Sequence, residues 1–552
     1  MSRLTEIFAF SEAFPLIFTQ AAFWIFLAVV YLFFVLVYRN IRIRTTYLFF
    51  VSLFFYYKTS GLFVLLLLFT TLSNFWLGKA IYYEKRNVIK QVWLSVSVIL
   101  NLFFLFYFKY ADFLVDALND FFGADLVVTN VLSAWGNALL QTDFFRVDTI
   151  ILPIGISFFT FQTITYCVDI YRKKLEPINS MVDYGFFISF FPHLVAGPIV
   201  RAAEFIPQIE RPTLVKRAEF NRATFLILKG LIKKMVFADF IAMHFLDKVF
   251  DAPSMFSGFT NLMALVGYSL QIYGDFSGYT DIAIGLALLM GFHLPLNFNS
   301  PYKALNCGEF WKRWHISLSS FLKDYLYIPL GGNKTGSYAS ILITGLILTG
   351  VSLASGSLIV TLSIAFVVFT FLALSSYFDS VHRYLIMNIN LMLTMLIGGL
   401  WHGASWKFVI WGGLNGLGII FYKYWRNVSP WEESKGYLAV IWKITLTFCF
   451  ITFTRLFFRG ESMEHIASWY NQVSNNMGWS EALTVLVEYK GVFLVMLLGY
   501  ITHWLPDRLK TWMFESYSDS PLLLKAVMFL VVALICYQAY SASFQPFIYF
   551  QF

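Results

Sequence analysis

The stretch from 339 to 378 runs for 40 residues without a single charged side chain. Other apolar runs, many long enough to cross a bilayer as a helix, recur along the chain between short clusters of Lys and Arg. Because backbone N–H and C=O groups at membrane depth must hydrogen-bond within the chain, only helices and closed barrels can span a bilayer. Continuous apolar runs of this length predict helices. We therefore expect an all-α polytopic membrane protein.

The composition is typical of a membrane protein: 59% of residues are hydrophobic, 20% aromatic and only 13% charged, with a mean hydropathy of +0.67. The net charge of +8 comes from short basic clusters between apolar runs, which are typical of topology signals rather than of a nucleic-acid site. The four cysteines have no paired spacing, and the histidines show no metal-ligand spacing. We expect the lipid bilayer as the surroundings, no nucleic-acid partner and no metal.

Charge in the connectors predicts sidedness. The connector at 112–148 carries six Asp and one basic residue, Arg146, whereas basic clusters follow the runs that end near 38, 78 and 167. Because Lys and Arg are retained in the cytoplasm, we expect these clusters inside, and 112–148 and the N-terminus outside. Counting broken segments, we expect roughly 11–14 spanning or re-entrant helices. The simple runs lie at about 16–38, 45–57, 61–78, 91–110, 149–167, 224–246, 258–273, 280–296, 391–411, 437–457, 486–505 and 521–541.

Two segments do not fit one straight span. The run 183–200 is interrupted by Pro192, Gly197 and Pro198, which predicts a broken or re-entrant segment. Irregular backbone at membrane depth must be buried in protein or line a watery cavity. The uncharged run at 339–378 fits either two short spans or one long tilted span.

The run 389–413 holds Trp401, His402 and Gly403 near its middle and carries one charge. An ionisable side chain at such depth is costly, which makes His402 a candidate for function. The alternative is a neutral imidazole hydrogen-bonded between packed helices. Gly399 and Gly403 form a small-xxx-small pair, which would let a helix or a ligand approach closely.

The segment 307–334 has aromatic and apolar residues at helical spacing, and a second stripe that includes Lys312, His315 and Lys323. This pattern predicts one amphipathic helix, ended near Pro329, at the membrane interface. A basic, aromatic helix at the headgroup boundary needs no catalysis to explain it. His315 is therefore a candidate on weaker grounds.

Six motifs follow one another along the chain. They are PIGISFFTFQTITYCVDIYR at 153–172, FFPHLVAGPIVR at 190–201, GDFSGYTDIAIGLALLMGF at 274–292, WKRWHIS at 311–317, DYLYIPLGGN at 324–333 and GLWHGASW at 399–406. This ordered set resembles the membrane-bound O-acyltransferase (MBOAT) family, and most closely the AlgI-like members of its bacterial AlgI/DltB-like branch. The resemblance covers about 45–425.

The resemblance implies one integral-membrane MBOAT domain over 1–552, with a family-like core at about 45–460 and less family-like spans at about 461–552. Two features depart from the family pattern. Asn415 stands where a histidine is common, and the 339–378 run separates two motifs that usually follow more directly. An even number of added spans keeps His402 on the family's side of the membrane. We therefore expect an inserted hairpin of two short spans at about 339–378.

The resemblance also implies a tunnel or funnel and transfer of an acyl group from a cytoplasmic thioester to a hydroxyl. A histidine can take the hydroxyl proton during attack. The resemblance gives this general-base role to His402, while His315 would orient the acceptor or polarise the thioester carbonyl. We expect acetyl-CoA as co-substrate and no bound cofactor. Candidate substrate-binding residues are Trp401, Trp314, Lys312, Arg313, Asn333 and Asn415.

AlgI-like motifs imply O-acetylation of an exported cell-surface polysaccharide at the bacterial cytoplasmic membrane, with an extracytoplasmic acyltransferase-like or esterase-like partner protein. One alternative is DltB-like transfer of D-alanyl groups from a carrier protein to an envelope polymer. Another is a transporter or channel in which His402 relays protons. Lys312, Arg313 and Lys323 could attract a phosphate-bearing donor, although snorkelling anchors explain them equally well.

Overall fold

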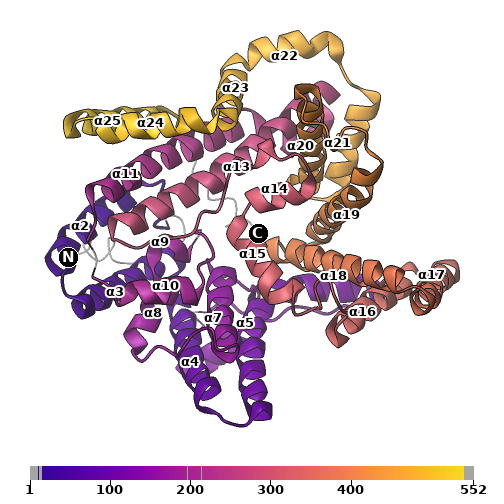
Figure 1. Ribbon diagram of the computed structural model, residues 1–552, viewed down its shortest axis with the longest axis horizontal. Coiled ribbons are helices and arrows are strands. Elements are labelled where there is room, and N and C mark those ends of the chain that lie inside the picture. The colour runs from indigo at the N-terminus through magenta and orange to yellow at the C-terminus, as the bar shows by residue number, and fades with distance from the viewer. Residues whose placement is uncertain (1–9, 12–14, 144, 196, 213, 540–552) are drawn as a thin grey trace.

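The computed structural model describes residues 10–11, 15–143, 145–195, 197–212 and 214–539, which form helices and connections without any strand (Figure 1). By length and composition, five helical stretches can cross a membrane, or up to seven if each of two sharply bent helix pairs counts as one span. The all-α polytopic architecture is confirmed. The expected number of 11–14 included short and re-entrant segments. Such segments are not counted as spans here, because a span must have at least 18 residues, and Ala21–Val37 is one apolar helix that is shorter than this.

The helices fall into three groups along the chain. The first group is α2 (Ala21–Val37), α3 (Ile41–Ser60), α4 (Val64–Tyr83), α5 (Asn87–Phe122), α6 (Val131–Leu140), α7 (Ile156–Tyr171), α8 (Met181–Ser189), α9 (Phe191–Leu194) and α10 (Ala202–Ile209). The second is α11 (Arg217–Leu231), α12 (Asp247–Asp251), α13 (Gly258–Leu289), α14 (Cys307–Arg313) and α15 (Ile316–Phe321). The third is α16 (Tyr338–Ser355), α17 (Leu358–Tyr377), α18 (Asp379–His402), α19 (Trp406–Val428), α20 (Tyr437–Arg459), α21 (Met463–Asn475), α22 (Ala482–Glu488), α23 (Lys490–Trp504), α24 (Asp507–Asp519) and α25 (Leu522–Ala539). The last two residues of the expected 521–541 span lie outside the described residues.

Helix α13 lies at the centre of the fold, and its 32 residues form one helix where the sequence predicted two spans, at 258–273 and 280–296. The prediction was wrong because Asp275 lies inside the helix, where its carboxylate is 2.6 Å from the ammonium of Lys234. A buried charge is tolerated when it is paired in this way. Helix α11 packs closely on α13, because a Cβ on Gly230 would lie 2.6 Å from the carbonyl oxygen of Gly278.

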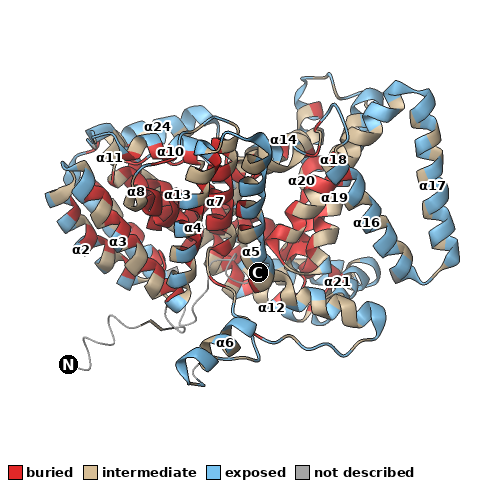
Figure 2. Cartoon of the chain, turned by 90° about the horizontal axis from the view of Figure 1, so that it is seen from below, coloured by how far each residue is buried: buried red, intermediate tan, exposed pale blue. Residues whose placement is uncertain are grey.

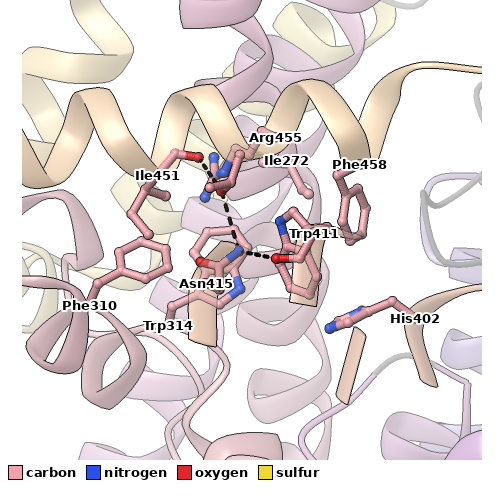
Figure 3. A pocket seen from close by; sticks show the side chains of 10 residues that line it. Ile272, Phe310, Trp314, His402, Trp411, Asn415, Ile451, Arg455 and Phe458 are labelled. Atoms are coloured by element: carbon pink, nitrogen blue, oxygen red, sulfur yellow. Dashed lines mark hydrogen bonds between the residues drawn. The ribbon is translucent and has the colours of Figure 1, made fainter. Parts of the chain in front are cut away.

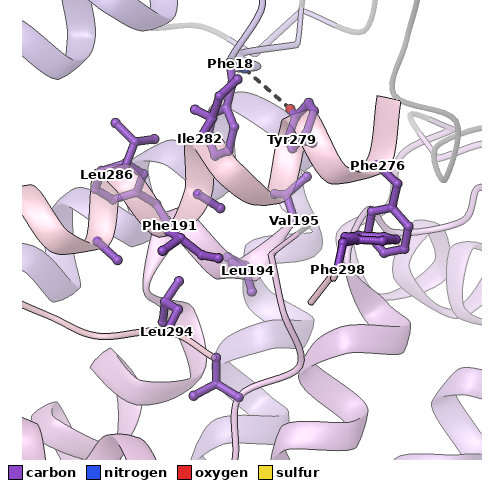
Figure 4. Close-up of a cluster of buried hydrophobic side chains, with 14 of the residues drawn as sticks. Phe18, Phe191, Leu194, Val195, Phe276, Tyr279, Ile282, Leu286, Leu294 and Phe298 are labelled. Atoms are coloured by element: carbon purple, nitrogen blue, oxygen red, sulfur yellow. Dashed lines mark hydrogen bonds between the residues drawn. The ribbon is translucent and has the colours of Figure 1, made fainter. Parts of the chain in front are cut away.

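An aromatic and aliphatic core surrounds the middle of α13 (Figure 4). The rings of Phe18 and Tyr279 stack with centroids 4.6 Å apart, and the Tyr279 hydroxyl accepts a hydrogen bond from the Phe18 N–H at 3.4 Å. The 183–200 segment enters this core as α8 and α9, and every described residue from Tyr184 to Val200 is buried. The predicted break is confirmed, and of the two surroundings that the sequence left open, burial in protein is the one observed, rather than the watery cavity at which the break hinted.

The structure places the charged connectors relative to the helix ends, and which end is cytoplasmic stays a prediction. Gln91, near the start of α5, donates to the hydroxyl of Tyr171 at the end of α7 at 3.4 Å, so two of the basic clusters lie at the same end. Helix α5 continues to Phe122, so the first part of the acidic 112–148 connector is helical. Arg44, which the sequence assigned to the basic connector after residue 38, lies in α3 instead and is buried, with its guanidinium 2.5 Å from the Ile209 carbonyl oxygen.

The uncharged 339–378 run forms two helices, α16 and α17, which are joined at Gly356. Gly356 has a φ of +55°, a left-handed conformation that glycine adopts without strain. No residue in the most apolar window of α17 is buried inside the protein. Figure 2 shows this helix at the edge of the molecule, coloured as a mixture of exposed and intermediate residues.

Candidate active site

His402 is the last residue of α18, and α19 begins at Trp406. The 389–413 run is therefore two helices rather than one span, because the chain turns back after His402 to form an antiparallel hairpin. The helices touch through glycines: a Cβ on Gly399 would lie 2.3 Å from the carbonyl oxygen of Phe408, and a Cβ on Gly412 would lie 2.3 Å from that of Met395. The close approach expected from the small residues is present.

Helix α18 is also anchored about halfway along its length. The side-chain amide of Asn390 donates to the carbonyl oxygens of Gly332 and Thr335, at 3.0 and 3.2 Å. These carbonyls belong to the turn at the end of the DYLYIPLGGN motif, since Gly332 lies within the motif and Thr335 just after it. The turn and its hydrogen bonds therefore hold the helix that carries His402.

The His402 side chain is 2% exposed and lies among aromatic rings. Ring centroids lie at 4.9 Å for Trp401, 5.0 Å for Trp411 and 5.5 Å for Phe458. All three rings meet the imidazole edge-on, an arrangement that suits the charge distribution of aromatic rings. The surroundings of His402 are therefore apolar and largely closed to water.

His315 lies at a break in the segment that the sequence predicted as one amphipathic helix over 307–334. Helix α14 ends at Arg313, His315 takes a left-handed φ of +44°, and α15 begins at Ile316. The single-helix prediction was wrong because the apolar spacing continues across the break and does not reveal it. The break turns His315 inward, where its side chain is fully buried, while Lys312 stays exposed.

The side chain of Asn297 stabilises the break at His315 through hydrogen bonds. Its side-chain oxygen accepts the backbone N–H of Ser317 at 3.1 Å, the Ser317 hydroxyl at 2.9 Å and the His315 Nδ1 at 3.2 Å. Because a backbone N–H can only donate, the Ser317 contact fixes this atom as oxygen. Nδ1 of His315 is then the donor, and Nε2 carries the lone pair of the neutral imidazole.

The structure brings the two histidines close to each other. The ring centroids of His315 and His402 are 6.5 Å apart, and the Trp401 ring lies 6.1 Å from His315. Trp401 also stacks on Phe161, with centroids 5.4 Å apart and planes at 17°. The RWHIS and WHG motifs, which are far apart in the sequence, therefore meet at one place in the fold.

Three cavities meet around the WHG motif. The large cavity, of about 200 Å³, extends from His402 to Lys323 and Tyr327. A water-sized void of about 10 Å³ lies between His402, Trp314, Asn415 and neighbouring side chains of α19 and α20 (Figure 3). The loop cavity, of about 60 Å³, lies on the other side of Trp401. It is lined by that indole, Lys109 and the loop 152–157.

The cavities approach the motif from opposite ends of the bundle. Asp324, next to Lys323, forms an ion pair with Arg201 at 2.7 Å and accepts a hydrogen bond from Arg172 through its backbone oxygen at 3.2 Å. The large cavity thus lies toward the predicted cytoplasmic end. The loop cavity lies beside the loop that follows the predicted outer connector.

The remaining candidate residues divide into two sets. Trp314 and Asn415 line the void, where the Asn415 amide donates to the Trp411 carbonyl oxygen at 2.8 Å. Lys312, Arg313 and Asn333 line none of the three cavities. Arg313 is paired with Glu309 at 2.7 Å, and the exposed Asn333 accepts a hydrogen bond from Tyr327 at 2.5 Å.

Sequence reasoning missed Asn297, Lys109, Trp411 and Arg455, which all lie at or beside the site. The buried Arg455 guanidinium lies 4.6 Å from the Trp314 ring centroid and lines the void. A lone cation in an otherwise apolar run is the signal that could have identified Lys109, whereas Arg455 shares its run with Lys443. Among the described residues, no group of three or more His, Cys, Asp and Glu side chains is placed to hold a metal ion.

The chain is similar in sequence to several known proteins. The family model for membrane-bound O-acyltransferases matches residues 172–388. The peptidoglycan O-acetyltransferase of Helicobacter pylori is 34% identical over 439 residues, which cover 75% of this chain and 70% of that protein. The probable alginate O-acetylase AlgI of Pseudomonas putida is 30% identical over 501 residues, covering 87% and 89%. The teichoic acid D-alanyltransferase of Bacillus subtilis is 26% identical over 322 residues, covering 56% and 70%.

The chain belongs to the membrane-bound O-acyltransferase family. It is therefore a multi-pass membrane enzyme of bacterial type that transfers acyl groups to hydroxyls, and not primarily a transporter or channel.

Proposed function

We propose that this enzyme transfers an acetyl group from acetyl-CoA to hydroxyls of an exported cell-surface polysaccharide, directly or through an extracytoplasmic partner protein. The observation that carries the proposal is the position of His402, which lines both the large cavity and the void, with His315 beside it and the loop cavity beyond Trp401. Two relatives that are at least 30% identical to this chain are named for O-acetylation of peptidoglycan and alginate, which supports acetyl as the acyl group.

In the proposed reaction, His402 takes the proton of an acceptor hydroxyl as its oxygen attacks the thioester carbonyl. A bond forms between that oxygen and the acyl carbon, the carbon–sulfur bond breaks, and the proton passes from His402 to the leaving thiolate. General-base catalysis of this kind contributes about 10²- to 10⁴-fold. The apolar, aromatic surroundings of His402 favour the neutral imidazole that a base requires.

His315 acts in this proposal on the acceptor rather than on the thioester. Its Nδ1–H is committed to Asn297, so the neutral ring offers a lone pair at Nε2. A lone pair can accept a hydrogen bond from a hydroxyl but cannot donate one to a carbonyl oxygen. The hydrogen-bond pattern therefore favours orientation of the acceptor over polarisation of the thioester.

The two larger cavities suggest how the substrates reach His402. The donor thioester would enter through the large cavity, whose rim carries Lys323, and the acceptor would arrive from the loop cavity beyond Trp401. Lys323 is the one cation among Lys312, Arg313 and Lys323 that lines a cavity with His402, which makes it the best placed to attract the donor phosphates.

The test is mass spectrometry of surface polymers from cells that carry wild-type protein, His402→Ala or the matched control His382→Ala. His382 is an exposed histidine on the same helix. We expect O-acetyl groups in the wild-type and His382→Ala polymers and none in the His402→Ala polymer. Normal acetylation with His402→Ala, at equal amounts of inserted protein, would contradict the role of His402.

A donor competition in proteoliposomes tests the acyl group separately. We expect purified protein to consume acetyl-CoA and to ignore a D-alanyl-loaded carrier protein. The reverse result would replace acetylation by the D-alanyl transfer for which the Bacillus subtilis relative is named.

A further inference from the structure

Two neighbouring side chains of α5 form hydrogen bonds to the last turn of α18, where His402 lies. The ammonium of Lys109 donates to the carbonyl oxygens of Trp401 and His402, at 2.6 and 3.2 Å. The hydroxyl of Tyr110 donates to the carbonyl oxygen of Leu400 at 3.0 Å. Three consecutive carbonyls at the end of the helix are thus bound by two residues from a single element.

These carbonyls are the groups that a helix leaves without intrahelical partners. The last C=O groups of a helix point away from the final turn and carry the negative end of its dipole. A positive donor at this position both satisfies the oxygens and offsets the dipole. The hydrogen bonds from Lys109 and Tyr110 therefore define where α18 ends, and His402 is its last residue.

A cation at this depth is a costly way to satisfy two carbonyls, because a neutral donor would do the same at a lower desolvation cost. Among the described residues, Lys109 forms no ion pair with an Asp or Glu side chain, so its charge is directed at the helix end. The ammonium also lies 5.9 Å from the Trp401 ring centroid and lines the loop cavity. The charge is thus at the site itself rather than in a distant structural contact.

We propose that Lys109 is a positioning residue for acyl transfer, which fixes the C-terminal turn of α18 and with it the direction of the His402 side chain. The inference rests on the proposed function, since it assigns Lys109 a role through His402. An ordinary stabilising cap would lower the amount of folded enzyme when removed. A positioning residue lowers the turnover of enzyme that is folded.

The experiment measures steady-state transfer in proteoliposomes, with acetyl-CoA as donor and, as acceptor, the surface polymer extracted from cells that carry His402→Ala. For Lys109→Met we expect kcat to fall about 100-fold with an unchanged KM for acetyl-CoA, because a misplacement of about 1 Å at a reacting group costs that much. Lys109→Arg, which keeps the charge and the donors, should recover activity to within about 10-fold of wild type. Tyr107→Phe is the matched control and should leave kcat unchanged, since Tyr107 bonds Asn130 and not α18.

The outcomes separate the two proposals. If His402→Ala is as active as wild type in the same assay, the proposed function fails. If His402→Ala is inactive while Lys109→Met keeps its kcat, only the role of Lys109 fails. A loss in Lys109→Met that Lys109→Arg does not restore, and that follows a lower melting temperature, would show an ordinary cap. Should Lys109→Met fail to insert, Lys109→Ala, which also removes the donor but adds no bulk, takes its place under the same criteria.

Discussion

Two consecutive hairpins, α16–α17 and α18–α19, are built from similar apolar sequence but have different surroundings. The first is exposed on the outside of the protein, and the second is packed inside it. No residue of the apolar window of α17 is buried in the protein, against 33% for α18. Nothing lies within 4 Å of a Cβ placed on Gly345 or Gly350 of the first hairpin, whereas a Cβ on Gly412 of the second would meet a neighbouring backbone. Hydropathy thus predicts that a segment enters the membrane. The placement of small and polar residues decides whether it faces lipid or builds a site.

The comparison is tested most strongly by adding one methyl group to each hairpin. Gly412→Ala would place a Cβ 2.3 Å from the Met395 carbonyl oxygen, so α18 and α19 must separate. We expect a loss of about 3 kcal/mol in stability, as overpacking of a tight contact costs, together with a clear loss of acyl transfer. Melting temperature in detergent and transfer activity are the measurements.

Gly350→Ala is the matched control in α16. A Cβ there meets nothing within 4 Å, and alanine is favoured over glycine inside a helix by up to about 1 kcal/mol. We expect unchanged or slightly higher stability and full activity. Equal damage by the two substitutions would mean that the hairpins do not differ in packing as described.

A medium effect is expected from the polar contacts beside the active site, compared with those of the first hairpin. Asn297→Ala removes the acceptor for His315 and Ser317, leaving buried donors without it, which costs about 1–2 kcal/mol. Acyl transfer should fall as well, because the His315 ring loses its fixed orientation. Ser352→Ala, which removes an exposed hydrogen bond to Thr361 in the first hairpin, should change stability by less than about 0.5 kcal/mol. Chemical denaturation of both variants beside wild type would measure the difference.

The smallest effect is expected on the outer surface of α17. Phe369 is 71% exposed to the surroundings of the protein, so Phe369→Leu exchanges one lipid-facing apolar side chain for another. We expect a stability change below about 0.5 kcal/mol and normal activity in proteoliposomes. A large loss would instead indicate that another protein covers this face in the assembled enzyme, and would narrow the contrast between the hairpins.

The sequence predicted the helical class, the broken 183–200 segment and the two histidines as candidates, because each depends on local pattern. It did not predict the breaks after Arg313 and His402, since apolar spacing continues across both. Nor did it predict the contact between Lys109 and His402, which joins residues 293 positions apart. Lys312, Arg313 and Asn333 were chosen from their motifs, but they line none of the three cavities, because membership of a motif does not fix where a side chain points.

The anchoring of α18 has a consequence for how this region can change. The helix is fixed at Asn390 by the turn around Gly332 and again at its end by Lys109. One residue added or removed between these two points would rotate His402 by about 100° and shift it by about 1.5 Å along the axis. The number of residues between Asn390 and His402 is therefore as important for the site as the histidine itself. Single insertions or deletions in this part of α18 should reduce acyl transfer far more than most substitutions there.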